Sequence, residues 1–234
     1  MTQVERRSLS HQVAALLRQY LDDEQFAAGD PIPPTRELAA RFGVSVPVIR
    51  EAIAELAGQG RLERAQGRAT VTRLPSAADL EGLFRSRVGR EADAVLQLHE
   101  FRRMLEVGAA RSAAARATSA DVAELRRRLA TWRDHPEDSP EFLEADLSFH
   151  RAIAETARND LVLMTMDAVA ALLFDARVVG WRGWRNSGRT VEEIIAAHAA
   201  IVAAIEAGDP DQAERAMHRH LDQASLGLHA ELDD

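Results

Sequence analysis

The sequence contains no cysteine, which excludes disulfide bridges and thiolate metal sites from its 234 residues. Lysine is also absent, so all 29 basic residues are arginine. No run of about 18 apolar residues occurs, and the first residues lack the apolar core of a secretory signal. We therefore expect a soluble, cytoplasmic protein without membrane-spanning helices.

Positive charge is scarce overall, and it is unevenly distributed. The formal net charge is −8 and the pI is about 5.5. Residues 1–75 hold 10 arginines and 9 acidic residues, whereas the remainder holds 19 arginines and 28 acidic residues. This balance argues against a protein that coats nucleic acid nonspecifically. It permits a small DNA-reading module joined to an acidic domain.

The first 75 residues have the pattern of a winged helix-turn-helix. Apolar positions at helical spacing predict three helices, near residues 8–24, 34–42 and 46–59. Gly43 is placed to end the second helix in the left-handed conformation, and Ser45 to cap the third. A β-hairpin with a turn at Gln66-Gly67 follows. Two helices joined by a short turn and followed by a hairpin are the outline of this module.

Three segments of this region resemble the DNA-binding signature of the GntR superfamily. They are Ile32-Pro33-Pro34-Thr35-Arg36-Glu37-Leu38-Ala39, Phe42-Gly43-Val44-Ser45 and Val48-Ile49-Arg50-Glu51-Ala52-Ile53. The resemblance continues through the wing, Gly67-Arg68-Ala69-Thr70-Val71, and covers about residues 8–73. It implies that the third helix enters the major groove of DNA and that the wing reaches toward the minor groove.

The resemblance also implies which side chains contact DNA. The matching positions are Thr35, Arg36, Ser45, Pro47, Arg50 and Arg68. Arginine can grip guanine or phosphate, and threonine and serine can bind phosphate. The alternative for each arginine is a solvated surface, which is our interpretation of Arg41, Arg61 and Arg64.

Two residues depart from the family pattern. Val46 stands where many members carry a base-reading arginine, so we expect a different operator sequence. Ala69 replaces the second glycine of the wing, which requires an adjusted wing tip if that position needs a positive φ.

The rest of the chain predicts an all-α domain. Residues 74–79 have the composition of a hinge, which separates a DNA-binding domain at 1–74 from a second domain at 75–234. Amphipathic patterns predict about seven helices, near residues 77–87, 92–117, 119–134, 139–157, 160–180, 190–207 and 210–230.

One carboxylate and three imidazoles lie on the apolar faces of three of these helices. Asp146 and His150 are one turn apart, His198 lies among isoleucines, and His220 follows Met217. Asp and neutral His suit Zn²⁺, or alternatively Ni²⁺, with positions left open for water or ligand. The alternative for each residue alone is a hydrogen-bonded core group, and Asp146 could simply pair with His150. We interpret the remaining histidines, which are His11, His99, His135, His218 and His229, as surface residues or residues without a role.

The same domain resembles the FCD effector domain of the FadR subfamily. The segments that carry the resemblance are 100–106, 146–150, 204–209 and 217–221, with His198. In that family an arginine at the position of Arg102 helps to hold the carboxylate of an organic-acid effector beside the metal. The alternative is an ion pair between Arg102 and Glu106, one turn on.

Three further residues have open interpretations. Asn159 matches a family asparagine, or only caps the next helix. Trp181 and Trp184 line a mobile loop or lid, or are ordinary packing residues.

The sequence thus predicts a homodimeric transcription regulator, a repressor, whose two recognition helices read a pseudo-palindromic operator. A small carboxylate bound at the metal and Arg102 would bias its DNA binding. One alternative is a regulator for which the metal itself is the signal. The other is a helical metalloenzyme, although no evident general base accompanies the motif. We predict no catalytic residues.

Overall fold

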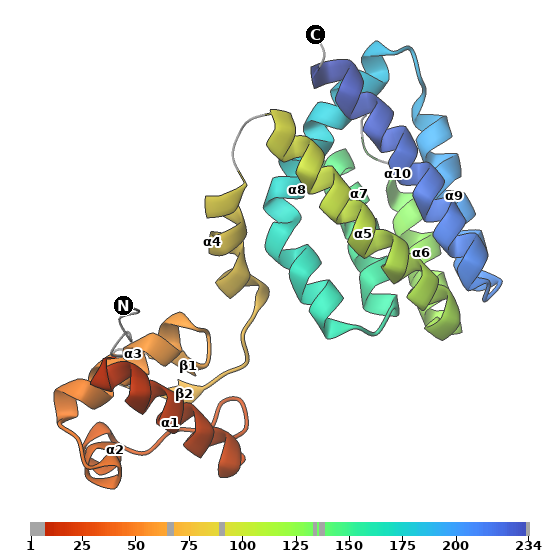
Figure 1. Ribbon diagram of the computed structural model, residues 1–234. Helices are drawn as coiled ribbons and strands as arrows, with labels where there is room; N and C mark the ends of the chain where they lie inside the picture. Colours follow the sequence, from red (N-terminus) through yellow and green to blue (C-terminus); the bar gives the residue numbers. More distant parts are fainter. Residues whose placement is uncertain (1–7, 65–67, 89–91, 133–134, 136–138, 233–234) are drawn as a thin grey trace, which may run out of the picture. The chain divides into compact units, whose positions relative to one another are not determined.

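The computed structural model describes residues 8–64, 68–88, 92–132, 135 and 139–232 (Figure 1). The chain divides into two compact units, Met1–Asp79 and Leu80–Asp234. The described elements of the first unit are α1 (Leu9–Asp23), α2 (Thr35–Phe42), α3 (Val46–Gly58), β1 (Leu62–Glu63) and β2 (Val71–Thr72). This is the three-helix and hairpin arrangement that the sequence predicts, with shorter strands than expected.

Local sequence signals account for the ends of the first helices. The Ser8 side chain accepts a hydrogen bond from the backbone N–H of His11 and so caps α1. Gly43 ends α2 with φ +66°, a left-handed conformation that glycine adopts without strain. Ser45 stands at the N-cap position of α3, but its side chain forms no capping hydrogen bond.

The hairpin is also paired with the segment that joins α1 to α2. Leu62 lies opposite Thr72 in the antiparallel pair β1–β2. The backbone N–H of Ile32 donates to the carbonyl of Thr70 at 2.9 Å, and Pro31 forms an isolated bridge with Val71. The segment before α2 therefore anchors the base of the wing. The expected turn at Gln66-Gly67 lies outside the described residues.

A single hydrophobic cluster fills the first unit, and α1 packs against α3 across it. Its buried members are Val13, Ala14, Leu17, Leu21, Ile32, Leu38, Ala39, Ile49, Ala52, Ile53, Leu56 and Leu62. These residues include most of the apolar positions that set the helical period of α1, α2 and α3, but Leu16, which has the same spacing in α1, is exposed.

The described part of the second unit is helical, as the sequence predicts. Its helices are α4 (Ala77–Arg87, which crosses the division between the units), α5 (Ala92–Arg116), α6 (Ser119–Trp132), α7 (Pro140–Thr156), α8 (Asp160–Asn186), α9 (Val191–Glu206) and α10 (Pro210–Leu232). Asn159 caps α8, because its side chain accepts hydrogen bonds from the N–H groups of Leu161 and Val162. The structure therefore supports the capping interpretation of this residue.

Helix α8 continues to Asn186, past the expected end near residue 180. Trp181 and Trp184 lie within it and are buried, so the interpretation of these residues as a loop or lid is wrong. Their indole rings belong to a hydrophobic cluster with Trp132, Phe142 and Ile195.

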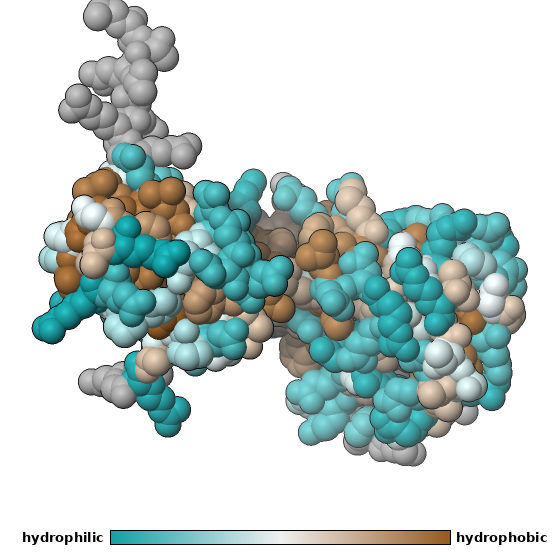
Figure 2. Space-filling model, turned by 90° about the horizontal axis from the view of Figure 1, so that it is seen from below, coloured by the Kyte–Doolittle hydropathy of each residue, from teal (hydrophilic) through white to brown (hydrophobic). Residues whose placement is uncertain are grey.

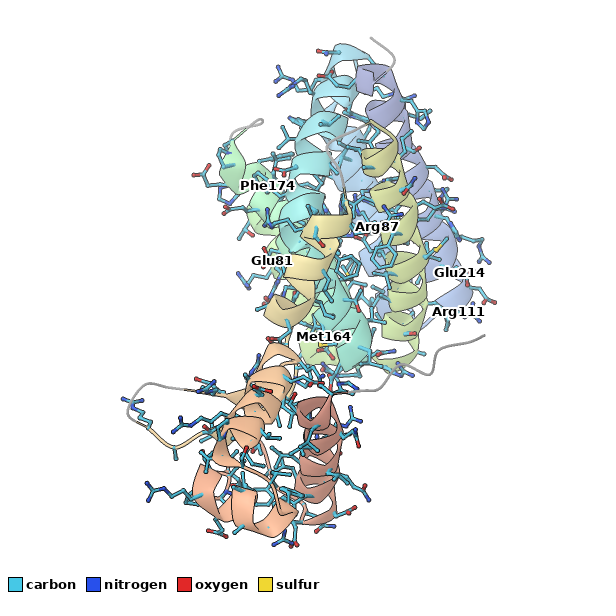
Figure 3. The ribbon with its side chains drawn as sticks, turned by 60° about the vertical axis from the view of Figure 1, so that its left-hand side comes forward. Glu81, Arg87, Arg111, Met164, Phe174 and Glu214 are labelled. Atoms are coloured by element: carbon cyan, nitrogen blue, oxygen red, sulfur yellow. The ribbon has the colours of Figure 1, made fainter. Side chains whose placement is uncertain are left out.

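Helix α10 packs against α8, α5 and α9 and so connects three other helices of the bundle (Figure 1). Figure 3 shows Arg111 of α5 beside Glu214 of α10, where Nη1 of the arginine lies 2.7 Å from Oε2 of the glutamate. Beneath this surface the main cluster contains residues of α5, α6, α7, α9 and α10, among them Leu125, Phe149, Ile201 and Met217. The inward faces of α7, α9 and α10 are therefore directed at one another.

The view in Figure 2 shows a largely hydrophilic surface over the second unit and hydrophobic residues gathered over part of the first. Leu9 and Leu16 of α1 are among the exposed large hydrophobic residues, with 55% and 51% of their surface exposed. Within the described residues, no helix combines the length and the apolar character needed to cross a lipid bilayer.

Candidate metal centre

The four residues that the sequence singled out as metal ligands lie together. Asp146 and His150 come from α7, His198 from α9 and His220 from α10. One potential ligand atom from each residue lies within 4.8 Å of those of the other three. The i, i+4 spacing in α7 puts Asp146 and His150 on one face. The packing of α9 and α10 against the bundle core supplies the other two imidazoles.

The nitrogens and oxygens of the cluster converge on one small volume. Nε2 of His150 lies 3.2 Å from Nε2 of His198. Oδ1 of Asp146 lies 3.2 Å from Nε2 of His198 and 3.6 Å from Nε2 of His150. The ring of His220 completes the group, 4.1 Å from the ring of His198 between centroids.

In two of the rings, the nitrogen on the side away from the cluster lies close to an oxygen atom. Nδ1 of His150 lies 2.7 Å from Oε2 of Glu106, and Nδ1 of His198 lies 2.7 Å from the carbonyl oxygen of Ile194. When Nδ1 carries the proton toward these oxygens, the Nε2 lone pair of each ring faces the cluster. This is the outer-shell arrangement that orients metal-binding histidines.

His220 has no such partner. It is buried, and neither of its ring nitrogens forms a hydrogen bond with any described residue. An unpartnered buried polar group is costly, and native proteins rarely keep one without a reason. A metal cation bonded to one of these nitrogens would supply the missing partner, so the residues present fit a metal ion.

Burial favours the uncharged form of two of the imidazoles. It lowers the pKa of His198, and it lowers the pKa of His220 well below its usual value, with the neighbouring His198 and His150 adding to the effect. For Asp146, burial acts to raise the pKa, but Arg177 and His150 outweigh it and hold that pKa well below its usual value. His198 and His220 thus offer neutral nitrogens and Asp146 an ionised carboxylate, which are the protonation states that bind divalent metals.

Two charged residues complete the buried site, and neither of them was predicted to take part in the metal centre. Glu106 pairs with Arg102, whose Nε donates to Oε1 at 2.7 Å, so the ion pair considered for Arg102 is formed. Arg177 of α8 donates from Nε to Oδ2 of Asp146. Arg177 lies on the inward stripe of its helix with Leu173 and Trp181, and the inward-arginine reasoning applied to Arg102 could have found it.

A cavity of about 80 Å³ adjoins the cluster. Asp146, His220, Arg102 and Arg177 contribute to its wall. The remaining described lining residues are His99, Trp132, Phe142, Leu143, Leu173, Ala176, Gly180, Trp181, Trp184, Ile194, Gln223, Ala224 and Leu228. The expectation that His99 is a surface residue is wrong. Its side chain is buried, with Nε2 3.1 Å from the carbonyl oxygen of Leu221, and burial lowers its pKa to about 4.

The positions that the resemblance assigns to DNA contacts lie on the first unit. Thr35 and Arg36 begin α2, Ser45 precedes α3, and Pro47 and Arg50 lie in its first turns. Thr35 is half-buried, and the others, with Arg68 of the wing, are exposed. Arg36, Arg50 and Arg68 form no ion pair with another described residue. Ala69 does not adopt a positive φ, so the wing accommodates alanine there without that strain.

Comparison with known proteins relates both units to characterised families. A model described as "Bacterial regulatory proteins, gntR family" matches residues 9–71, and a model of the FCD domain matches residues 97–223. The HTH-type transcriptional repressor NanR of Cronobacter sakazakii is 32% identical over 223 residues, which cover 92% of this chain and 84% of the relative. The NanR repressor of Citrobacter rodentium is 32% identical over 232 residues, which cover 96% and 87%.

Among solved structures, Streptococcus agalactiae GntR matches with a TM-score of 0.70 and 24% identity. The match covers 92% of this chain and 97% of that chain. At this level of identity the likeness establishes the fold alone.

Proposed function

Because the chain belongs to the gntR family of bacterial regulatory proteins and carries an FCD domain, we propose that its DNA binding responds to an organic acid bound beside a divalent metal ion. The chain is a DNA-binding transcription regulator rather than an enzyme. We propose that it represses transcription, as the relatives named above do, and we assign its ligands and site residues as follows.

We assign the metal to Asp146, His150, His198 and His220. The observation that carries this assignment is His220, a buried imidazole whose two nitrogens lack a hydrogen-bond partner among the described residues, and which faces the other three ligands. Three imidazole nitrogens and one carboxylate oxygen suit Zn²⁺, with Ni²⁺ as the alternative. When bound, the ion would supply a Lewis-acidic position for a ligand oxygen. Glu106 and the Ile194 carbonyl orient the imidazoles from the outer shell.

Charge balance supports a carboxylate as the organic ligand. Without a metal, the buried side chains of Arg102 and Arg177 balance those of Glu106 and Asp146. A divalent ion adds two positive charges to this buried group, and an anion offsets the cost of burying them. Arg102 lines the cavity beside the cluster, and we assign it to the effector's carboxylate in addition to its pair with Glu106.

For DNA, we assign Thr35, Arg36, Ser45, Pro47, Arg50 and Arg68 as contacts. Their location at the start of α2, the start of α3 and the wing supports a recognition helix in the major groove. Because an effector that weakens DNA binding is itself bound less well by the DNA complex, the two sites are linked reciprocally. We propose that the regulator acts as a homodimer on a pseudo-palindromic operator.

Thermal melting of the metal-loaded protein against a panel of small carboxylic acids, repeated after chelation, tests the proposal. A ligand at 100 times its Kd should stabilise the fold by about 2.7 kcal/mol. Stabilisation that disappears after chelation supports the metal–carboxylate site. If no acid acts and operator binding depends on the metal alone, the metal itself is the signal.

A further inference from the structure

The cavity beside the candidate metal centre is polar at one end and apolar at the other. On α7, Phe142 lies one turn before Asp146. On α8, Trp181 lies one turn after Arg177. Since α7 and α8 follow each other in antiparallel directions, both steps lead to the same end of the bundle (Figure 1). Toward that end, the lining of the cavity thus changes from a charged group, Asp146 or Arg177, to an aromatic ring, Phe142 or Trp181.

On α9 and α10 as well, apolar residues line the cavity on the same side of the candidate ligands. On α9, Ile194 lies one turn before His198. On α10, Ala224 and Leu228 lie one and two turns after His220. The four helices that carry Asp146, Arg177, His198 and His220 therefore line the cavity with apolar side chains in the direction of the α8–α9 connection.

Aromatic rings form much of this apolar end. The centroids of Trp132 and Phe142 are 5.2 Å apart, and those of Phe142 and Trp181 are 5.0 Å apart. Rings fixed by one another in this way offer a rigid apolar surface with little entropy to lose on binding. They suit a flat or branched hydrocarbon group better than a hydrated one.

Few polar groups at this end are available to a ligand. Nε1 of Trp184 already donates to the carbonyl oxygen of Thr190 at 3.1 Å. Beyond the metal cluster, Arg102 and Arg177, the described lining residues with a polar side-chain atom are His99, Trp132, Trp181, Trp184 and Gln223. Among their fully buried atoms, Nε1 of Trp132 and Oε1 of Gln223 form no hydrogen bond with a described residue. A ligand with several hydroxyl groups would leave most of them buried without a partner, which is costly.

From these contacts we infer that the effector is a compact carboxylic acid with an apolar or aryl body, and not a polyhydroxylated acid. The inference rests on the proposed function, since the effector's carboxylate would lie between the metal and Arg102, beside Arg177, whose Nη atoms form no hydrogen bond with a described residue. Its body lies along Phe142, Ile194 and Leu228. The Trp132 N–H and the Gln223 carbonyl oxygen could form hydrogen bonds with one or two polar substituents on this body.

Calorimetric titration of the full-length, metal-loaded protein tests this ligand class. The probes are phenylacetate and benzoate, gluconate and galacturonate, with acetate as the reference that carries only the carboxylate. Each buried methylene should increase affinity about fourfold, so an aryl acid should bind at least about tenfold more tightly than acetate. The polyhydroxylated acids should bind no more tightly than acetate.

A matched pair of variants locates the body of the ligand. Leu228→Asn puts a polar group at the apolar end and should remove the advantage of the aryl acids over acetate, without changing metal content. Leu226→Asn is the control on the same helix, because Leu226 is 54% exposed. Ile194→Thr, at a half-buried position, repeats the test if Leu228→Asn does not fold.

Tighter binding of gluconate or galacturonate than of the aryl acids overturns the inference and leaves the proposed function intact. Equal affinity for acetate and the aryl acids overturns it as well. If no acid of the panel, acetate included, binds the metal-loaded protein or changes its DNA affinity, the proposed function itself fails.

Discussion

Nε of Arg177 donates a hydrogen bond to Oδ2 of Asp146, and this pair joins α8 to the helix that carries two of the candidate metal ligands. Oδ1 of the same carboxylate lies 3.2 Å from Nε2 of His198. One carboxylate thus connects a buried cation to the imidazole cluster. The stability of the second unit and the geometry of the candidate metal centre therefore depend on the same contact.

Replacement of Arg177 by methionine should destabilise the metal-free protein by about 3–5 kcal/mol, because it leaves the buried Asp146 carboxylate without its cation. The loss should be smaller in the metal-loaded protein, where the ion takes over part of that role. Urea unfolding with and without metal measures the difference. Arg182→Met is the control, since that side chain is 62% exposed, and it should change stability by less than about 0.5 kcal/mol. Equal losses with and without metal would contradict a metal bound by Asp146.

His220→Ala should abolish stoichiometric metal binding, because it removes one of four ligands. We expect affinity to fall by at least about 100-fold, more than the loss typical of outer-shell changes. Metal content after dialysis and melting with and without chelator are the measurements. The control is His218→Ala on the same helix, which should retain one metal per chain. A variant of His220 that still melts at a lower temperature after chelation would argue for a different ligand set.

Glu106→Gln should weaken metal binding by about 10–100-fold without removing it, since Glu106 acts through His150. The amide cannot accept the Nδ1 proton with the strength of a carboxylate, so the imidazole loses basicity. Competition with a chromophoric chelator gives the affinity. Glu100→Gln, at an exposed position of the same helix, is the matched control. An unchanged affinity in Glu106→Gln would remove this residue from the metal site.

Arg50→Ala should weaken operator binding by about 1–3 kcal/mol if its guanidinium reads a base. The operator can be selected from random duplexes with the full-length protein, and fluorescence anisotropy then gives the Kd. Arg18→Ala, exposed on α1 and outside the assigned contacts, should bind as the unmodified protein does. If Arg50→Ala loses the same factor on unrelated duplexes, the residue contacts phosphate rather than a base.

Gly60→Ala should destabilise the first unit by more than about 1 kcal/mol, because Gly60 has φ +75° and an added Cβ would lie 2.7 Å from Oδ2 of Asp79. That carboxylate is paired with Arg73, which also holds its pKa below the usual value. Gly58→Ala is the control in α3, where nothing lies within 4 Å of the new Cβ. It should be neutral or stabilising, because alanine is the better helix former. Denaturant unfolding compares the two, and equal stability would contradict the strain argument.

Most of the fold followed from local signals. Ser8 and Gly43 mark the helix ends where the sequence predicts them, because capping and left-handed turns depend on the nearest few residues. The end of α8 was predicted too early, near residue 180. The stretch that contains Trp181 and Trp184 is helical because its indoles pack against Trp132 and Phe142, which are distant in sequence.

The candidate site, too, was predicted only in part from the sequence. Asp146 and His150 could be paired from the sequence, since four residues make about one helical turn. The apolar faces of their helices also pointed to His198 and His220, and the resemblance to the FCD domain added the role of Arg102. The parts that were missed come from other helices. Glu106 lies behind His150, and Arg177 lies against Asp146. His99, expected at the surface, is buried.

The sequence by itself determined the class of protein, the order of its helices and the apolar faces that carry the four candidate ligands, because periodicity and motif spacing are properties of neighbouring residues. Only the tertiary structure decided which charges share the buried site and that the cavity becomes apolar beyond Arg177. The physical reason is that burial, charge pairing and cavity shape depend on contacts between helices far apart in the chain.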